Sequence, residues 1–120
     1  MDEIRTWRRP YVTRHTLRAE MFTVCNERAE PIGRAEFDYQ LNGDVIFAYY
    51  IERSSRGRGY GTELVRAMAK HAKTGGCKRC LAYVHEANAA SCRVLERNGF
   101  GRVAADDRCL PTDLKYQLDL

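Results

Sequence analysis

Several features that identify other classes of protein are missing from this chain of 120 residues. No apolar run approaches the roughly 20 residues that a membrane-spanning helix requires, and the amino-terminus has no hydrophobic signal region. Three prolines are too few for a proline-rich linker, and no repeat or low-complexity stretch divides the sequence. Because a chain of this length can form one hydrophobic core without metal or disulfide support, we expect a single domain over residues 1–120 and no membrane partner.

The five cysteines are too irregularly spaced for a disulfide framework. An odd number of scattered thiols is typical of a reduced cytoplasmic protein, and we expect that location. Cys77 and Cys80 form a C-x-x-C pair that could contribute to a zinc site. No second pair stands at the spacing that would complete such a site, so we expect no metal.

The most informative segment is the glycine-rich stretch Arg-Gly-Arg-Gly-Tyr-Gly at residues 56–61. Before it, residues 45–51 are almost entirely apolar, which predicts a buried strand. After it, residues 62–73 carry apolar side chains at helical spacing. A strand, a glycine turn and a helix amino-terminus together present several backbone N–H groups, and this arrangement favours an anion, usually a phosphate. Without a Cβ, the glycines allow the backbone to approach it closely.

The glycine spacing excludes the commonest phosphate-binding motifs. No lysine follows Gly61, as a P-loop requires, and Thr62 stands where a dinucleotide-binding G-x-G-x-x-G has its third glycine. The pattern that does match is R-x-x-G-x-G, formed by Arg56, Gly59 and Gly61. It resembles the loop that binds the pyrophosphate of acetyl-CoA in the GNAT superfamily of N-acetyltransferases. Glycine–arginine runs also occur in disordered RNA-binding tails, but the flanking strand and helix argue against that interpretation.

A second segment carries the same resemblance. Residues 80–84 are apolar and predict another buried strand, which leads to Asn88, Ser91 and, after a short predicted helix, Gly99-Phe100. This order is similar to the later GNAT signature, in which N-x-x-[AS] and a short helix are followed by G-F. Residues 94–97 are close to the version in the branch that acetylates ribosomal proteins. The resemblance spans residues 32–100 and could extend to residue 120.

The resemblance implies an α/β GNAT fold with a mixed central sheet, an antiparallel amino-terminal half and two main helices. Residues 34–41 support it independently because they alternate strictly between apolar and polar side chains, which predicts a half-buried antiparallel strand. Asn42-Gly43 predicts a hairpin turn between this strand and residues 45–51. Further strands are expected at residues 21–25, directly after Phe100, and at residues 114–120.

The amino-terminal region departs from the family. GNAT domains usually place two helices after the first strand, and too little chain precedes Met21 for both. We therefore expect this helix pair to be reduced or absent, and a second copy of the chain could complete the acceptor site. Residues 1–18 carry five arginines, and a partly disordered, solvated end is favoured over an RNA contact. We expect no nucleic-acid partner.

By resemblance, the cosubstrate is acetyl-CoA and the reaction is direct transfer of its acetyl group to a primary amine. Backbone groups of Tyr49, Tyr50 and Ile51 are expected to hold the pantetheine arm and polarise the thioester. Asn88 is expected to hydrogen-bond the coenzyme, with capping of the following helix as the alternative. The pyrophosphate site is expected to be formed by Arg56, Gly57, Arg58, Gly59, Tyr60, Gly61 and Thr62.

The groups that transfer protons cannot be carried over from the family. Leu95 stands where many members have a tyrosine that protonates the leaving thiolate, and Tyr83 stands where some have a glutamate base. His85 and Glu52 are therefore the candidates for removing the amine proton, with a water relay as an alternative. Both usual residues are missing, so a second hypothesis remains beside that of an enzyme. In it, the chain is a GNAT-fold protein that binds acetyl-CoA as a sensor or structural subunit.

Charge is distributed unevenly along the chain. Residues 53–79 have a net charge of +7, and residues 19–52 have a net charge of −5. The basic segment surrounds the glycine loop and would attract the phosphates of coenzyme A. The acidic segment contains the strands that border the acceptor side in this fold, and it would attract a protonated amine of a protein or a small molecule. The similarity to the ribosomal-protein branch favours a protein N-terminus or lysine.

Overall fold

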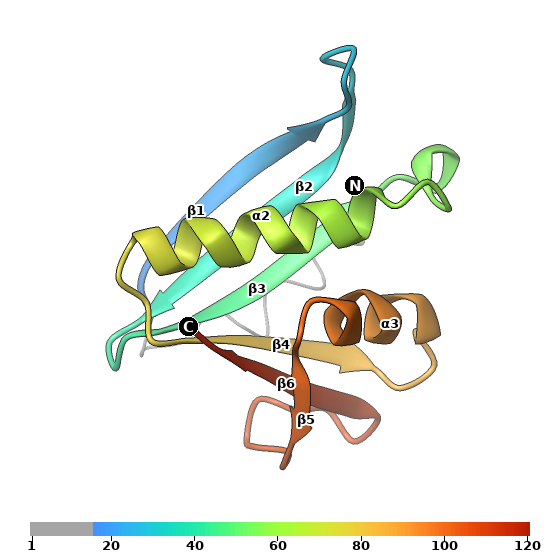
Figure 1. The fold of residues 1–120 in the computed structure, drawn as a ribbon. Helices are drawn as coiled ribbons and strands as arrows, with labels where there is room; N and C mark the ends of the chain where they lie inside the picture. The colour runs from blue at the N-terminus through green and yellow to red at the C-terminus, as the bar shows by residue number, and fades with distance from the viewer. Residues whose placement is uncertain (1–15) are drawn as a thin grey trace.

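In the computed structural model, which describes residues 16–120, six strands form one mixed sheet in the order β1-β2-β3-β4-β6-β5 (Figure 1). Neighbouring strands pair antiparallel except for β3 and β4, which are parallel. Two helices, α2 and α3, and a short 3-10 helix, η2, connect them. The elements are β1 (Thr16–Cys25), β2 (Pro31–Gln40), β3 (Asp44–Ile51), η2 (Arg53–Ser55), α2 (Tyr60–Thr74), β4 (Arg79–His85), α3 (Ala89–Arg97), β5 (Gly101–Val103) and β6 (Asp113–Asp119).

This architecture confirms the predicted mixed sheet with an antiparallel amino-terminal half and two main helices. The predicted hairpin turn is present, with the Gly43 N–H donating to the Gln40 carbonyl at 3.1 Å. The first strand begins at Thr16, earlier than predicted. The predictions of a reduced first helix pair and of a partly disordered arginine-rich end concern residues that lie largely outside the described part of the chain.

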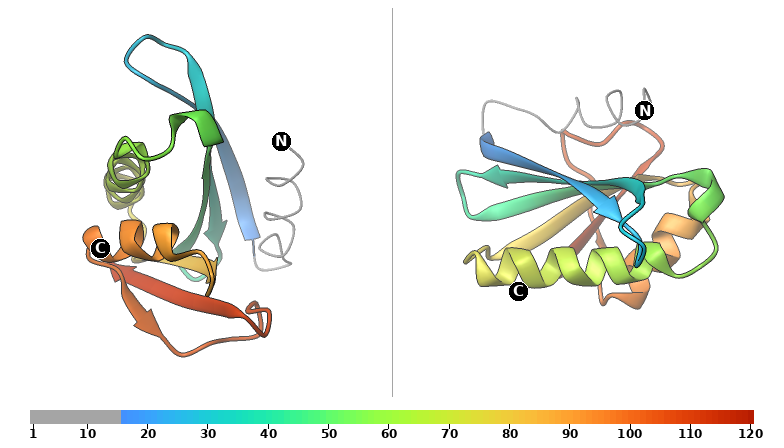
Figure 2. Two further views of the ribbon diagram at one scale, coloured as in Figure 1. Left: turned by 90° about the vertical axis from the view of Figure 1, so that its right-hand side faces the viewer. Right: turned by 90° about the horizontal axis from the view of Figure 1, so that it is seen from above.

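Both helices cover the same face of the sheet (Figure 2). Along α2, the buried residues Val65, Met68 and Ala72 follow one helical stripe. From α3, Leu95 is fully buried and joins them in a core with the inward-facing side chains of the sheet, among them Phe47. The helix predicted from the amphipathic pattern of residues 62–73 is therefore confirmed, with its apolar stripe in the core. This packing holds the start of α2 beside the end of β3.

The outer face of β2 differs from its prediction as a half-buried strand. Glu36, Asp38 and Gln40 were expected on a solvated face, but none is more than 5% exposed. Leu41, expected on the buried face, lies beyond the strand and is 65% exposed. The loop between β5 and β6 reaches over this face, where Arg108 Nη2 donates to Gln40 Oε1 at 3.0 Å. The prediction was wrong because alternation along one strand does not reveal what packs on its second face.

The pairing of β3 with β4 stops halfway along the strands. The parallel register runs from Asp44–Arg79 to Phe47–Ala82. Beyond that point β3 continues along β2, and β4 continues along β6. The two strands therefore diverge toward their carboxyl ends (Figure 1), the edge at which open α/β sheets usually bind ligands. Among residues 16–120, no helix combines the length and apolar character needed to cross a membrane.

Candidate active site

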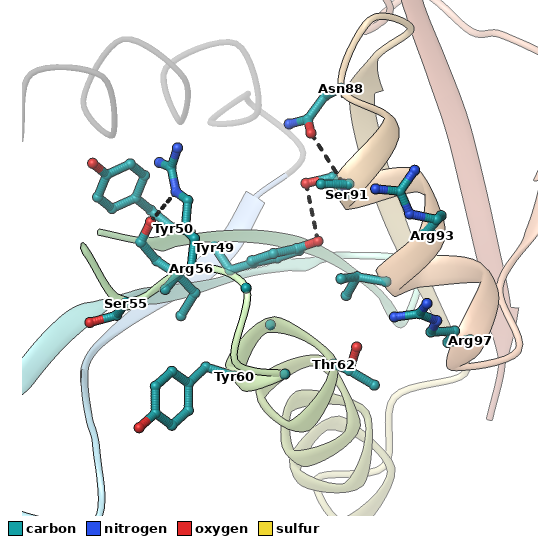
Figure 3. Close-up of a pocket in the computed structure, with 16 residues that line it drawn as sticks. Tyr49, Tyr50, Ser55, Arg56, Tyr60, Thr62, Asn88, Ser91, Arg93 and Arg97 are labelled. Atoms are coloured by element: carbon teal, nitrogen blue, oxygen red, sulfur yellow. Dashed lines mark hydrogen bonds between the residues drawn. The ribbon is translucent and has the colours of Figure 1, made fainter. Parts of the chain in front are cut away.

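Two adjoining cavities occupy the region where β3 and β4 diverge. The first, which we call the loop cavity, has a volume of about 430 Å³ and lies between residues 55–62 and α3 (Figure 3). The second, the strand cavity, has a volume of about 320 Å³ and lies between the ends of β3 and β4. The two cavities adjoin at a common wall, and we refer to them together as the groove. The common wall consists of Tyr49, Tyr50, Arg56, Asn88 and Ser91.

The glycine loop enters α2 through conformations that favour glycine. Gly57 has φ of 79° and Gly59 has φ of 82°, both in the left-handed region. A Cβ at either position would meet no atom within 4 Å, so the space beside the loop is open to a ligand. The first turn of α2, whose N–H groups lack acceptors within the helix, borders the loop cavity through Tyr60, Gly61 and Thr62. This geometry suits an anion.

The two loop arginines have different positions. Arg56 Nε donates to the Ile51 carbonyl at 2.8 Å, and its guanidinium carbon lies 5.3 Å from the centre of the Tyr50 ring, a cation–π distance. Arg56 thus fastens the loop to the end of β3. Arg58 lines neither cavity. The sequence prediction grouped both arginines around a phosphate, and the structure brings only Arg56 to the groove.

The side chain of Tyr60 points away from the loop cavity (Figure 3). Its hydroxyl donates to Glu27 Oε1 at 3.1 Å, in the turn between β1 and β2. Burial is the first cause of the raised pKa of Tyr60, and the hydrogen bond to Glu27 raises it further. Tyr60 therefore connects the start of α2 to the β1–β2 turn, and it borders the cavity without presenting its hydroxyl to it.

Asn88 borders both cavities and also caps α3. Its Oδ1 accepts a hydrogen bond from the Ser91 N–H at 3.1 Å, which is the capping geometry considered from the sequence. The cap uses the side-chain oxygen, so the amide nitrogen can donate to another group. Both roles predicted for Asn88 are therefore compatible with its geometry.

Ser91 belongs to the N-x-x-[AS] motif, and the structure adds it to the predicted site residues. The Tyr49 hydroxyl donates to Ser91 Oγ at 3.3 Å, which links the end of β3 to the first turn of α3 (Figure 3). Burial raises the pKa of Tyr49, so its hydroxyl remains protonated at neutral pH. The common wall therefore contains two hydroxyl groups in contact.

Sequence analysis also missed two arginines on α3. Arg93 and Arg97 are one helical turn apart and line the loop cavity on the wall opposite Arg56 (Figure 3). Their i, i+4 spacing after the Asn88 motif was the available signal. The residues that line the loop cavity include three arginines and no carboxylate, so its charge favours an anionic ligand.

The two candidate bases lie in different surroundings. His85 lines the strand cavity, and its Nδ1 accepts a hydrogen bond from the Ala87 N–H at 3.0 Å. A neutral His85 ring therefore carries its hydrogen on Nε2. Glu52 lines neither cavity. Its Oε1 accepts hydrogen bonds from the hydroxyls of Ser54 and Ser55 at 3.1 and 3.3 Å, so Glu52 instead organises the turn of η2.

Tyr83 borders the strand cavity but is held from behind. Its hydroxyl donates to Asp106 Oδ2 at 2.7 Å, and Lys115 Nζ lies 3.0 Å from the same oxygen. Burial raises the pKa of Tyr83, and the hydrogen bond to Asp106 raises it further. Tyr83 thus remains a neutral phenol that fastens the β5–β6 loop to β4. It is therefore not placed to act as the base that the GNAT resemblance puts at this position.

Three of the seven acids of the acidic segment are too buried to contribute to the negative surface that its charge predicts. Glu36, Asp38 and Asp44 are all buried. Asp44 is paired with Arg79, whose Nε and Nη2 donate to its two carboxylate oxygens at 2.9 Å each. The net charge of the segment therefore overstates its exposed negative charge, because it does not distinguish buried carboxylates from exposed ones.

The cysteines of the described part of the chain are free thiols. Within residues 16–120, no group of three or more His, Cys, Asp or Glu side chains is arranged to hold a metal ion. Burial raises the pKa of Cys80 to about 12, so this member of the C-x-x-C pair keeps its proton at neutral pH. A thiolate, the form that binds zinc, is therefore disfavoured at this position.

Comparison with known proteins identifies the family of the chain. A family model for the acetyltransferase (GNAT) domain matches residues 1–101. The search of curated proteins finds no match to the sequence.

Solved structures share the fold at low sequence identity. The GNAT domain of S. lividans PAT is 19% identical with a TM-score of 0.73, covering 85% of this chain and 61% of that one. An acetyltransferase from Agrobacterium tumefaciens str. C58 is 24% identical with a TM-score of 0.74, at 85% and 61% coverage. RimL, a ribosomal L7/L12 alpha-N-protein acetyltransferase solved in complex with coenzyme A, is 22% identical with a TM-score of 0.74, at 85% and 62% coverage.

The chain therefore spans about three fifths of the length of these three proteins. Their likeness to it is one of fold. The family model, in contrast, covers most of the sequence. With the glycine loop, the groove and the diverging strands in place, the chain belongs to the GNAT acetyltransferase family.

Proposed function

We propose that this chain transfers an acetyl group from acetyl-CoA to a primary amine. The main support is that the loop cavity adjoins the strand cavity at one common wall. A groove of this shape suits a long molecule with phosphates at one end and a reactive group at the other. When bound, acetyl-CoA supplies a thioester whose carbonyl carbon is open to attack by an amine.

The residues present fit such a cosubstrate. The left-handed glycines Gly57 and Gly59 and the first turn of α2 offer backbone N–H groups to a pyrophosphate. The arginines that line the loop cavity balance the negative charge of the pyrophosphate. Beyond the last pair of β3 with β4, we expect backbone groups of Tyr49, Tyr50 and Ile51 on the β4 side to hold the pantetheine arm and the thioester oxygen, except the Ile51 carbonyl, which accepts from Arg56.

We assign the handling of the amine proton to His85 in preference to Glu52, because only His85 lines the groove. Its Nδ1 is engaged by the Ala87 N–H, so direct acceptance of a proton there requires that bond to open. The alternative route passes the amine proton through a water molecule to solvent, because Nε2 of a neutral His85 ring already carries a hydrogen. On the leaving-group side, the hydroxyls of Tyr49 and Ser91 are proton donors at the wall where the two cavities meet.

For the acceptor, we favour the amine of a protein N-terminus or lysine. RimL, with which the chain shares its fold, is a ribosomal L7/L12 alpha-N-protein acetyltransferase, and the sequence of residues 94–97 is close to that branch. The free thiols are in keeping with a cytoplasmic location. A second copy of the chain is a candidate for completing the acceptor side.

The proposal is tested by calorimetric titration with acetyl-CoA of the wild-type chain and of Gly59→Asp and Gly61→Asp. Both substitutions add bulk and negative charge beside the loop cavity. Gly76→Asp is the matched control for Gly59→Asp, because Gly76 has a similar φ of 84°, lines neither cavity, and would meet no atom within 4 Å of an added Cβ. Binding that only the two loop variants abolish, followed by acetylation of peptide amines, would support the enzyme.

A folded wild-type chain that does not bind acetyl-CoA would overturn the proposal. Binding without turnover on any amine would instead favour the sensor or structural subunit, for which the buried Leu95 in place of the usual tyrosine is the main support.

A further inference from the structure

We infer that Arg93 and Arg97 of α3 bind the 3′-phosphate of coenzyme A and make this chain selective for coenzyme A over 3′-dephospho-coenzyme A. The inference rests on the proposed function, because it assigns the second phosphate site of the same cosubstrate. Coenzyme A carries a pyrophosphate and, on the ribose beyond it, a separate phosphate monoester. The glycine loop accounts for the first anion only.

The two arginines form the α3 wall of the loop cavity. They lie with Ala90 and Val94 on one stripe of the helix, and all four residues line the cavity. Both arginine side chains are exposed, and Figure 3 shows them on the wall opposite Arg56. They are therefore placed to reach an anion that extends from the loop toward solvent.

The two arginines of the glycine loop are less suitably placed for this anion. Arg56 is held by the Ile51 carbonyl and the Tyr50 ring at the β3 end of the groove. Arg58 lines neither cavity. The cations that face the outer part of the loop cavity therefore come from α3.

No neighbouring acid neutralises this pair within the described residues. The one acidic residue of α3, Glu96, accepts a hydrogen bond from the Tyr116 hydroxyl at 2.8 Å on another side of the helix. The lining of the loop cavity contains no carboxylate. A guanidinium presents a planar set of donors that matches phosphate oxygens, so two of them one helical turn apart form a suitable site for a phosphate monoester.

Packing holds this face of α3 beside the glycine loop. Asn98 Nδ2 donates to the Thr62 carbonyl at 3.2 Å and to the Val94 carbonyl at 2.9 Å, which ties the end of α3 to the first turn of α2. At Gly61, an added Cβ would lie 3.4 Å from Val94 Cγ2. The two phosphate sites are thus carried on directly packed elements, and their separation is fixed by the fold.

The test is calorimetric titration of the full chain with coenzyme A and with 3′-dephospho-coenzyme A, which lacks only the phosphate in question. We expect the wild type to bind coenzyme A about tenfold more tightly. The double variant Arg93→Gln/Arg97→Gln should bind the two ligands within about twofold of each other, with its affinity for 3′-dephospho-coenzyme A unchanged. The matched control Arg66→Gln removes an exposed α2 arginine that lines neither cavity, and it should retain the wild-type selectivity.

Two outcomes would overturn the inference without touching the proposed function. In one, the wild type binds both ligands equally. In the other, the double variant loses affinity for both ligands to the same extent, which would assign the arginines to the pyrophosphate. If the folded wild type binds neither ligand, the proposed function fails first and the inference fails with it. Circular dichroism of each variant confirms that it is folded.

Discussion

The hydroxyl of Tyr49 lies 3.3 Å from the hydroxyl of Ser91, on the wall that the loop cavity shares with the strand cavity. This contact joins the end of β3 to the first turn of α3. Leu95, at the position where many GNAT members have a tyrosine, is fully buried in the core and has no proton to give. The Tyr49–Ser91 pair therefore offers an alternative proton source for a leaving thiolate.

Removing either hydroxyl should slow turnover more than it weakens binding. We expect Tyr49→Phe and Ser91→Ala each to lower kcat by about a hundredfold, the usual scale for a lost proton donor, with the Kd for acetyl-CoA within about threefold of wild type. Stopped-flow or coupled assays give kcat, and calorimetry gives Kd. An unchanged kcat in both variants would contradict this role and leave the pair as a packing contact.

The two roles of Asn88 can be separated by two substitutions. Asn88→Ser keeps a side-chain oxygen that can cap α3, whereas Asn88→Ala removes the cap and should cost about 1 kcal/mol of unfolding free energy. If Asn88 also contacts the coenzyme, both variants should bind acetyl-CoA more weakly, although only Asn88→Ala is less stable. Urea unfolding and calorimetry measure the two effects. Wild-type affinity in Asn88→Ser would limit Asn88 to capping.

Gly33 is required by the close approach of β2 to β3. A Cβ at this position would lie 1.9 Å from the Tyr50 carbonyl oxygen, so Gly33→Ala must push β2 away from β3. The displacement would occur at Tyr50, which lines both cavities. We expect a loss of about 2 kcal/mol or more in unfolding free energy and weaker acetyl-CoA binding. Gly101→Ala, with no atom within 4 Å of the added carbon, is the control. Equal stability of the two variants would contradict the geometry of this contact.

Turnover should depend on His85 and not on Glu52. His85→Gln should lower kcat by about a hundredfold, because it removes the imidazole from the strand cavity. Glu52→Gln should leave kcat within about threefold, since Glu52 lies outside both cavities. Initial rates at saturating acetyl-CoA provide the comparison. The reverse result would move the base to Glu52, and wild-type rates in both variants would favour a water relay without either side chain.

Asp106 should contribute an acid-sensitive part of the stability. Burial alone would raise the pKa of Asp106, but hydrogen bonds from Tyr83 and Lys115 outweigh it and hold the pKa below its usual value. A carboxyl with a lowered pKa stabilises the fold above its unfolded pKa, and this stabilisation is lost as the pH falls through the folded value. Asp106→Asn should therefore cost about 1–3 kcal/mol at pH 7 and less at pH 3.

Urea unfolding at pH 7 and at pH 3 measures this pH dependence. Asp107→Asn, at the exposed neighbouring position, is the control and should change neither value. A destabilisation in Asp106→Asn that is the same at both pH values would show that the Asp106 charge is not its origin.

Much of the fold followed from short-range patterns. Residues 45–51, 62–73 and 80–84 form their predicted strands and helix because an apolar run or a helical stripe must be buried wherever the core lies. The second face of β2 could not be predicted, since its cover includes Arg108, far along the chain. Periodicity describes one element at a time, and burial depends on the others.

The site was predictable where a motif fixes the backbone and was not where side-chain direction decides. Gly57 and Gly59 identify the loop because their left-handed backbone conformation strongly favours glycine. Arg56 and Arg58 are two residues apart, yet the left-handed turn at Gly57 separates them, and only Arg56 borders the groove. The spacing of Arg93 and Arg97 puts them on one face of α3, but the packing of α3 against α2 decides that this face borders the loop cavity.

Because the β3–β4 pairing ends early, a bound ligand should contribute to the stability of the sheet. Between the half of the sheet formed by β1, β2 and β3 and the half formed by β4, β5 and β6, the strand pairing runs from Asp44–Arg79 to Phe47–Ala82 and ends there. A molecule bound in the groove would contact both halves of the sheet and stabilise their arrangement while it is bound. At a concentration of one hundred times its Kd, such a ligand adds about 2.7 kcal/mol to the unfolding free energy. The supply of coenzyme would then set how long the chain survives heat or proteolysis as well as how fast it works.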